Sequence, residues 1–428
     1  MSKAILQEKM QERLLQFIWQ EKYFNTSSLF TETGEEIVIQ DAGLFNTRQG
    51  PDFLDARILL NGTKWAGHVE IHIKSSQWYQ HKHHSDKNYN NVILHVVWEN
   101  DDKMLSDSIP TLVLQNRVPS IMLSRYQTLM QQNSGIACKE LLHKVPETVW
   151  KGWKKELLTR RLTRKSEMVL DRYTEARNNW EECSWWWIAR QFGGPVNAVF
   201  FEQVARSLPI NTLMRHRSQV IQMEALLLGQ ANFLKESNCD PYVQLLQREH
   251  RFLSSKYQLS EVHGQAQLLR MRPAGFPAVR LAQLAMLLHR WKEIQTHIFE
   301  SNDWKGLETM LNITANDFWH YHYTLEEATP FQPKHLGKET IHHLIINAIV
   351  PLVYAIGYRH QQPHFRQRAI SWLEELPAEK NSIISNWNRE GIISKNAAGS
   401  QALCELKNYY CNYKKCLDCQ LCHHLLNR

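Results

Sequence analysis

The chain has 428 residues, of which 43% are hydrophobic and 22% charged, with only 17 glycines and 14 prolines. This composition excludes a collagenous, low-complexity or largely disordered protein and predicts a folded chain of about two to three domains. The 50 basic and 43 acidic residues leave a net charge of +7, which permits binding to a polyanion without requiring it.

The charged residues and apolar runs of the sequence bear on where the chain resides. The first 25 residues carry Glu8, Glu12 and Glu21, where a signal peptide needs an uninterrupted apolar stretch. The longest mostly apolar run, residues 348–358, is shorter than the roughly 18 residues of a membrane span. We therefore expect a cytoplasmic protein with no membrane partner.

A helix followed by strands is expected in the first third of the chain. Residues 5–24 interleave apolar and charged side chains at helical spacing. The pair Asn61-Gly62 is typical of a tight hairpin turn between two strands. About five strands are expected, at residues 36–40, 53–60, 64–75, 91–98 and 111–114.

Helical periodicity takes over after residue 145 and continues to the C-terminus. Apolar residues recur at spacings of three and four in segments that include residues 150–170, 195–208, 216–234, 278–298 and 340–357. The sequence thus predicts an α+β domain at residues 1–145, an all-α domain at 146–400 and a cysteine-rich metal-binding tail at 401–428.

One strand of the expected sheet carries a row of ionisable side chains. Strict alternation places four of them on one face: His68, Glu70, His72 and Lys74. Asp52 starts the preceding strand, which the hairpin folds back beside this one. Because neighbouring carboxylates repel unless a cation lies between them, Asp52 and Glu70 are predicted ligands of Mg²⁺ or Mn²⁺. A lysine on the same face can stabilise charge that develops on a phosphate.

The stretch from about residue 10 to 118 resembles the restriction-endonuclease-like PD-(D/E)xK nuclease superfamily. The motif of that superfamily is a Pro-Asp, a hairpin and a strand with an acid-x-Lys; Pro51-Asp52 and Lys74 match its first and last elements. The resemblance implies a small mixed sheet and a metal-dependent nuclease in which Asp52 and Glu70 hold the metal. His72 would then be a further ligand or base, and Lys74 would stabilise the transition state.

His72 stands where this motif has its second acid, and three interpretations stay open. His72 takes over the ligand role, or Glu70 serves from its place further along the strand. In the third, the resemblance is accidental and the strand is an ordinary exposed face with mixed charges.

A second group of potential ligands follows this strand. Imidazole and carboxylate are groups that zinc or manganese accepts. Four such side chains lie close by: His81, His84, Asp86 and His95. We expect them to support the sheet ligands or to form an alternative transition-metal set, although a histidine inside an apolar strand, such as His95, usually hydrogen-bonds as a core residue.

Five of the eight cysteines crowd into the last 25 residues: Cys404, Cys411, Cys416, Cys419 and Cys422. In a reducing compartment such crowding favours metal ligands over disulfides. The last four are predicted to hold either Zn²⁺ or a [4Fe-4S] cluster. Unliganded surface cysteines are the remaining alternative, and the role of Cys404 stays open.

The same segment resembles the iron–sulfur loop of the adenine-specific DNA glycosylases. In that family a Gln-Ala helix precedes the cysteines, as Gln401-Ala402 does here. The cysteines of this chain are more closely spaced than those of the family. The resemblance implies an iron–sulfur cluster in the tail.

Basic side chains gather on the first helix of the all-α domain and in one later loop. Arginines around a helix that begins near Pro277 suit a phosphate through guanidinium forks and backbone donors. A solvated helix face, or pairing with acids of neighbouring helices, is the alternative. Phosphate contacts are predicted for Lys154, Arg161, Arg164, Lys165, Arg270, Arg272 and Arg280.

Along nearly its whole length the chain resembles an uncharacterised bacterial family, domain of unknown function 2851. The likeness is carried by residues 50–53, 65–72, 92–97 and 272–280 and by the terminal cysteines. That family implies no activity, so the functional interpretation rests on the residues themselves.

The leading hypothesis is a cytoplasmic, metal-dependent nuclease of DNA that serves in repair or processing. Nucleic acid, with DNA favoured, is the expected partner, and the oligomeric state is left undefined. Two alternatives stay open. One is a non-catalytic nucleic-acid-binding protein with a degenerate nuclease core, and the other is a zinc-dependent hydrolase that uses the histidines.

Overall fold

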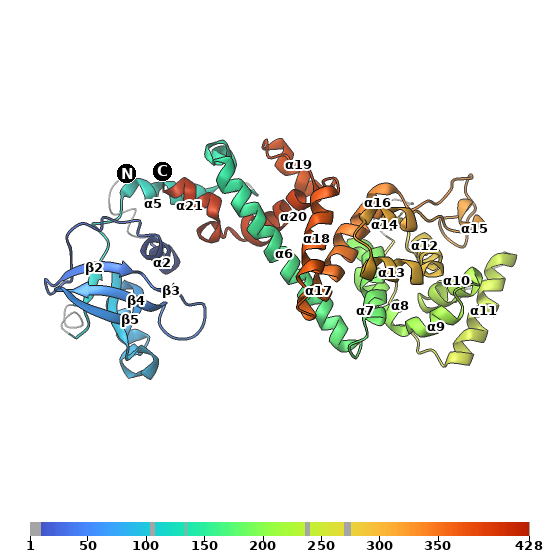
Figure 1. The fold of residues 1–428 in the computed structure, drawn as a ribbon, viewed down its shortest axis with the longest axis horizontal. Helices are drawn as coiled ribbons and strands as arrows, with labels where there is room; N and C mark the ends of the chain where they lie inside the picture. Colours follow the sequence, from blue (N-terminus) through green and yellow to red (C-terminus); the bar gives the residue numbers. More distant parts are fainter. Residues whose placement is uncertain (1–9, 103–107, 133–134, 236–239, 269–274, 428) are drawn as a thin grey trace. The chain divides into compact units, whose positions relative to one another are not determined.

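The computed structural model describes residues 10–102, 108–132, 135–235, 240–268 and 275–427. The chain, which is coloured from the N-terminus (blue) to the C-terminus (red) in Figure 1, folds as two compact units. Unit 1 comprises Met1–Trp153 together with Lys407–Arg428, and unit 2 comprises Lys154–Leu406. The expected α+β organisation is confirmed, because a sheet precedes a long series of helices and the cysteines lie near the C-terminus.

Unit 1 contains a seven-stranded sheet in the order β1-β2-β4-β5-β6-β7, with β3 paired to β4. Strands β4 and β5 form an antiparallel hairpin, whereas β5, β6 and β7 run parallel to one another. The strands are β1 (Leu29–Phe30), β2 (Glu36–Asp41), β3 (Leu44–Phe45), β4 (Phe53–Leu60), β5 (Thr63–Lys74), β6 (Val92–Glu99) and β7 (Thr111–Val113).

The turn between β4 and β5 forms where the sequence predicts it. Asn61 and Gly62 have φ values of 47° and 77°, the left-handed pair that a two-residue hairpin turn requires. Strands β1 and β3 were not expected, because two residues are too few to show an alternation of apolar and polar side chains.

Helix α2 (Glu12–Gln20) packs against β5 with a buried apolar face that includes Leu15, Phe17 and Trp19. The expected helix over residues 5–24 is thus shorter at its C-terminal end, and residues 5–9 lie outside the described part of the chain. The connection from β5 to β6 contains α3 (Gln77–Gln80) and the 3-10 turns η1 (His83–Ser85) and η2 (Lys87–Tyr89).

The C-terminal segment belongs to unit 1. Its helix α21 (Gln420–Leu426) contacts α5 (Ser120–Gln131) and the 3-10 turn η3 (Lys139–Lys144). Ahead of α21 in the sequence come the π-helical turn η6 (Leu406–Tyr410) and the 3-10 turns η7 (Cys411–Tyr413) and η8 (Cys416–Asp418).

The extended elements of unit 2 in its described residues are helices, joined by loops that contain isolated β-bridges. The expected helix at 278–298 is two helices, α12 (Pro277–His289) and α13 (Trp291–Glu300). The one at 340–357 contains the π-helical turn η5 (Ile345–Ile349) between α16 (Lys338–Leu344) and α17 (Val350–Arg359). The helices are α6 (Glu147–Glu175, which begins in unit 1), α7 (Trp180–Phe192), α8 (Gly194–Ser207), α9 (Ile210–Arg215), α10 (Val220–Gln230), α11 (Pro241–Tyr257), α12 (Pro277–His289), α13 (Trp291–Glu300), α14 (Trp304–Leu311), α15 (Asp317–His320), α16 (Lys338–Leu344), α17 (Val350–Arg359), α18 (Pro363–Glu375), α19 (Ser382–Arg389) and α20 (Ala397–Glu405).

The segment Lys338–Arg359 is long and apolar enough to cross a membrane by length and composition alone. However, 83% of its apolar window is buried inside the protein, which is typical of the core helix of a soluble protein. Its apolar character is therefore accounted for by packing.

Candidate metal centre

Asp52 and Glu70 lie together at the β4–β5 hairpin. The backbone N–H of Asp52 donates to Glu70 Oε2 at 3.0 Å, and Asp52 Oδ2 accepts from the backbone N–H of Ile71 at 3.2 Å. The side chain of Glu70 is only 7% exposed. The convergence that the hairpin predicts is confirmed. The exposed-face alternative is wrong for Glu70 and His72, both of which are buried, because α2 and α3 pack on β5.

Helix α2 adds two polar side chains that the sequence did not single out. Gln16 Nε2 donates to Asp52 Oδ1 at 2.9 Å and lies 3.4 Å from Glu12 Oε1. Gln16 is buried and Glu12 is half-buried. Their spacing of four residues places them on one helix face, but nothing local to the sequence indicates that this face meets Asp52.

Burial raises the pKa of both Asp52 and Glu70, and the charge of Asp52 raises that of Glu70 further. Burial also raises the pKa of Glu12, against an opposing effect of His81. Carboxyl groups that repel one another in a desolvated place are typical of a site that holds a cation.

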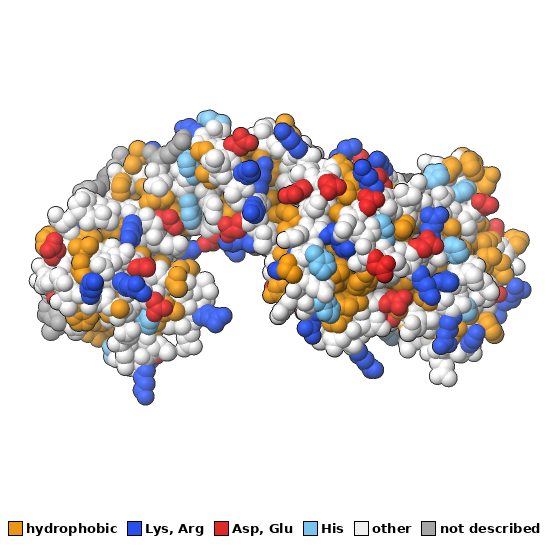
Figure 2. All heavy atoms as spheres, in the orientation of Figure 1, with side chains coloured by type: hydrophobic (Ala, Val, Ile, Leu, Met, Phe, Trp, Pro, Cys, Tyr) orange, Lys and Arg blue, Asp and Glu red, His pale blue; other side chains and the backbone are white. Residues whose placement is uncertain are grey.

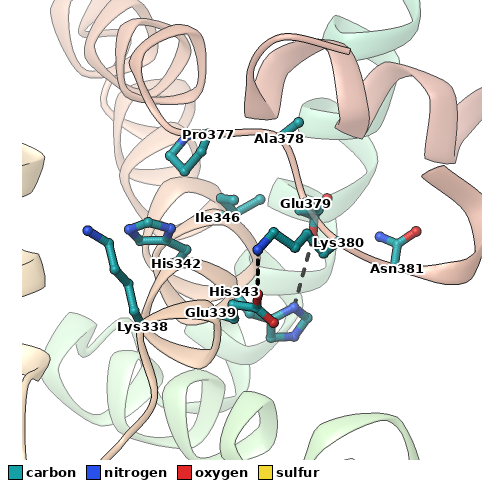
Figure 3. Close-up of a pocket in the computed structure, with 10 residues that line it drawn as sticks. All are labelled: Lys338, Glu339, His342, His343, Ile346, Pro377, Ala378, Glu379, Lys380 and Asn381. Carbon is teal, nitrogen blue, oxygen red and sulfur yellow. Dashed lines mark hydrogen bonds and ion pairs between the residues drawn. The ribbon is translucent and has the colours of Figure 1, made fainter. Parts of the chain in front are cut away.

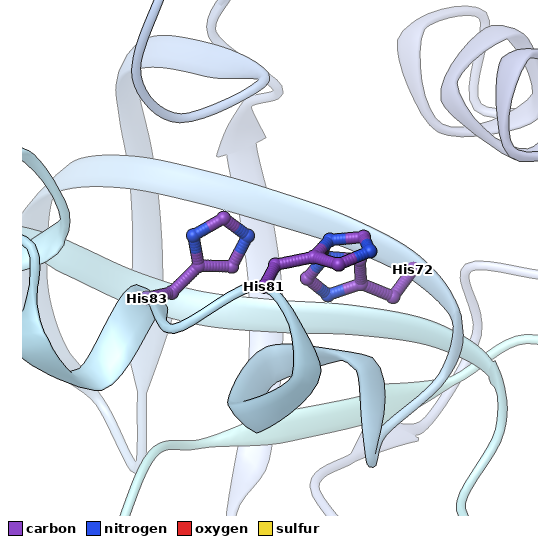
Figure 4. A group of neighbouring side chains, drawn as sticks. All are labelled: His72, His81 and His83. Carbon is purple, nitrogen blue, oxygen red and sulfur yellow. Dashed lines mark hydrogen bonds between the residues drawn. The ribbon is translucent and has the colours of Figure 1, made fainter.

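Three histidines lie beside this pair: His72, His81 and His83, which are drawn in Figure 4. Each has a ring nitrogen that lies within 4.8 Å of a ring nitrogen of the other two. His72 Nε2 is 3.2 Å from His81 Nδ1, and His72 Nδ1 is 2.9 Å from His95 Nε2. The donor atoms of this trio are close enough to share an ion.

Glu70 joins the carboxylates to the histidines. Its Oε1 lies 3.3 Å from His83 Nε2 and 3.5 Å from His72 Nε2. His83 Nε2 is buried, and no described residue forms a hydrogen bond with it. The two ligand sets that the sequence kept apart are therefore one site, with nitrogen and oxygen donors side by side.

Histidine 83 was missed, whereas His84 and Asp86 were proposed. His84 packs against Tyr79, and the carboxylate of Asp86 accepts from Asn88 N, so neither joins the trio. Lys82 has a left-handed φ of 61°, which turns the chain between α3 and η1 so that His83 and not His84 reaches the site. A residue with positive φ that is not glycine leaves no signal in the sequence.

His72, His83 and His95 are held in their neutral form. Burial, then the neighbouring histidines, lowers the pKa of His72 to about 2. Burial likewise lowers the pKa of His95 to about 3 and that of His83 to about 4. Neutral imidazole is the form that binds a metal ion.

We expect the metal-free protein to be most stable near about pH 6.5. Below it, the histidines of the unfolded chain take up protons while His72, His83 and His95 stay neutral, so stability falls as the pH falls. Above it, Glu70 keeps its proton in the folded state and loses it on unfolding, so stability falls as the pH rises. Thermal unfolding in chelator across this range measures both slopes. The alkaline slope should be reduced in Glu70→Gln, and an unchanged slope in that variant would assign it to other groups.

Lys74 lies away from the carboxylate pair. Its Nζ is 3.8 Å from Asp101 Oδ2, and its side chain is 53% exposed. Four residues along a strand separate it from Glu70 by roughly 13 Å. The acid-x-base unit that faces Asp52 is therefore Glu70-Ile71-His72, and a catalytic role for Lys74 stays a prediction.

The basic residues of α6 make contacts inside unit 2. Arg164 Nη2 lies 2.7 Å from Glu405 Oε2, and Arg161 Nη1 lies 3.4 Å from the same atom. Lys165 Nζ donates to Asn347 Oδ1 at 2.6 Å, and burial lowers its pKa well below the usual value. Lys154 is half-buried on the same helix. These groups follow the alternative of pairing with neighbouring helices, and phosphate binding by them stays a prediction.

The arginine loop is only partly described. Arg280 Nη1 donates to Gln283 Oε1 at 3.1 Å, and burial lowers its pKa. Arg270 and Arg272 lie outside the described residues. On the face shown in Figure 2, basic and acidic side chains are interspersed over the helices of unit 2.

Unit 2 also contains a cavity of about 370 Å³ between α16 and the segment that follows α18 (Figure 3). Lys380 Nζ pairs there with Glu339 Oε1 at 2.7 Å, and His343 Nδ1 lies 3.9 Å from Glu379 Oε1. The cavity also contains imidazole and carboxylate groups, but its acidic and basic side chains are paired with one another, so it differs from the sheet site in charge.

The C-terminal cysteines differ in their surroundings. Cys419 and Cys422 are buried, and Cys411 and Cys416 are half-buried. Cys404 belongs to unit 2, where its Sγ lies 3.9 Å from Asn381 Nδ2. None of these five forms a disulfide.

Fold and site together define an α+β protein with a buried carboxylate–histidine cluster on a mixed sheet. The chain belongs to the family described as "Protein of unknown function (DUF2851)", which it matches over residues 12–382. No curated protein and no solved structure matches the chain.

Proposed function

We propose that the protein is a metal-dependent nuclease that hydrolyses phosphodiester bonds in DNA, in repair or processing. The observation that carries the proposal is the position of Glu70, which lies within 3.5 Å of His72 and His83 and accepts the N–H of Asp52. One buried cluster thereby combines the carboxylates and imidazoles that metal-dependent hydrolases use.

The donor set favours Mn²⁺ or Zn²⁺ over Mg²⁺, because imidazole nitrogen suits the former ions and Mg²⁺ prefers oxygen alone. Glu70, His81 and His83 would hold the ion, with His72 as a further ligand and Asp52 beside it. A bound divalent ion polarises a phosphate oxygen and lowers the pKa of water.

The protein's own residues supply position and access. His95 fixes the ring of His72 by its 2.9 Å contact, and Gln16 fixes Asp52 by its 2.9 Å hydrogen bond. His81 is exposed and Glu12 half-buried, so solvent and substrate reach the cluster at this edge.

Two further features support a nuclease of the restriction-endonuclease-like type. Helix α2, the antiparallel β4–β5 hairpin and the parallel strand β6 come in this order along the chain, as in that superfamily, with the strands β1–β3 ahead of the hairpin and α3 ahead of β6. The net charge of +7 permits a polyanionic substrate.

The test is cleavage of labelled double-stranded, single-stranded and branched DNA, and of RNA, in Mn²⁺ or Zn²⁺ beside a chelator control. We expect cleavage of DNA that Asp52→Asn lowers by at least about 100-fold. Glu36→Gln, an exposed carboxylate on β2, is the matched control and should cleave as the wild type does.

Two outcomes would replace the proposal. Binding that persists in chelator and weakens steeply with salt, without cleavage, would favour the non-catalytic nucleic-acid-binding protein. Zinc-dependent hydrolysis of small esters alone would favour the zinc hydrolase.

A further inference from the structure

A fifth cysteine lies with the C-terminal four in unit 1. Cys138 precedes η3 and is 273 positions before Cys411, and the sequence gives no sign that the two are neighbours. It is buried and forms no disulfide. The turn η3, which Cys138 leads into, contacts α21, the helix that begins after Cys419 and contains Cys422.

Two hydrogen bonds fix the same two segments to each other. Lys407 Nζ donates to the carbonyl oxygen of Gly135 at 2.6 Å, three residues before Cys138. Lys414 Nζ donates to the carbonyl oxygen of Met130 at 2.8 Å. Each lysine therefore ties one side of the cysteine loop to the chain just ahead of Cys138.

The thiols lie close to one another. Cys138 is within range of electrostatic interaction with Cys411, Cys416 and Cys419, and Cys422 forms a side-chain hydrogen bond with Cys416. Cys138, Cys419 and Cys422 are buried. Thiolates gathered in a buried place repel one another and are stable only when a soft cation neutralises them.

We propose that Cys138 is a ligand of a thiolate metal centre that it completes with the C-terminal cysteines. The centre joins two segments far apart in sequence, as the four-cysteine sites of structural zinc and of iron–sulfur clusters do. Five thiols of unit 1 are available, and either chemistry needs four of them.

The C-terminal cysteine segment also contacts helix α2 and the turn that follows it. Arg13 Nη2 lies 2.5 Å from Asp418 Oδ1. The ring of His423 meets Phe17 edge-on at 4.7 Å, and Tyr23 Oη donates to the carbonyl oxygen of His423 at 3.2 Å. Helix α2 presents Glu12 and Gln16 to Asp52. Cys138 is thus a positioning residue for that site, a consequence that rests on the proposed nuclease, whereas the metal centre itself does not.

The test measures metal and not cleavage, so its failure is distinct from failure of the nuclease. Full-length protein purified without oxygen is analysed for acid-labile sulfide, for visible absorption and for the zinc or iron that a thiol-blocking mercurial releases, so that an ion at the sheet site is not counted; Cys138→Ala and Cys183→Ala are analysed beside it. Cys183 is a buried free cysteine of unit 2 and provides the matched control. We expect Cys138→Ala to lower the bound metal by at least about tenfold and Cys183→Ala to leave it unchanged. Iron with sulfide identifies a cluster, and zinc alone identifies a single ion.

A second measurement uses the wild type, in case Cys138→Ala does not fold. Maleimide labelling with and without a metal chelator is read by peptide mass spectrometry. Removal of the metal should expose Cys138 together with Cys419 and Cys422, while Cys183 stays protected in both conditions. Protein without zinc or iron, full metal in a folded Cys138→Ala, or labelling of Cys138 that ignores the chelator would overturn the proposal.

Discussion

Glu70→Gln is expected to weaken metal binding at the sheet site by about 10- to 100-fold or more and to abolish cleavage, while it stabilises the metal-free protein. The amide keeps an oxygen that can accept the N–H of Asp52, and it is neutral without the proton that Glu70 must take up on folding at neutral pH. Because one pKa unit corresponds to about 1.4 kcal/mol, we expect a gain of roughly 1–3 kcal/mol in the free energy of unfolding at neutral pH.

The opposite signs of the two effects make this variant informative. Isothermal titration with Mn²⁺ or Zn²⁺ gives the affinity, and denaturant unfolding in chelator gives the stability. Glu36→Gln makes the same chemical change on an exposed strand position and should alter neither quantity. A Glu70→Gln variant that is less stable without metal and still binds it would show that Glu70 serves the fold and not an ion.

Glu202→Gln is expected to destabilise unit 2 by about 3–5 kcal/mol. Glu202 Oε2 lies 2.9 Å from Arg172 Nη2 and 2.8 Å from Arg190 Nη1, and its Oε1 lies 2.7 Å from Arg206 Nη2. Burial opposes its charge, but hydrogen bonds from Arg172 and Arg206 outweigh burial and lower the pKa of Glu202. Removal of the anion leaves three guanidinium groups facing one another with a neutral amide between them.

The matched control is Glu175→Gln, whose carboxylate also pairs with Arg206, at 2.6 Å, but is 53% exposed. An exposed pair contributes about 0–1 kcal/mol, so this change should be nearly neutral. Because the pKa of Glu202 is lowered, its contribution is present above the usual glutamate range and is lost as the pH falls below it. Urea unfolding at neutral pH compares the two variants. Equal losses in the free energy of unfolding would mean that burial of Glu202 among its three arginines contributes nothing.

The sequence by itself determined the elements whose pattern is local. Strand β4 is expected and found at Phe53–Leu60, because alternating side chains and the Asn61-Gly62 turn act over neighbouring residues only. The Asp52 and Glu70 pair follows from that same turn, which fixes the register of the hairpin.

Only the tertiary structure decided which distant side chains complete the two clusters. Glu12 and Gln16 join Asp52 because α2 packs on β5, and Cys138 joins the C-terminal cysteines because η3 contacts α21. Likewise, the pattern of basic residues on α6 suits contact with a phosphate as well as pairing with an acid of the protein itself. Only the structure shows that Arg164 pairs with Glu405. Periodicity records which face of an element is apolar. The partner of that face is set by packing between segments far apart in the sequence, for which a single sequence carries no local signal.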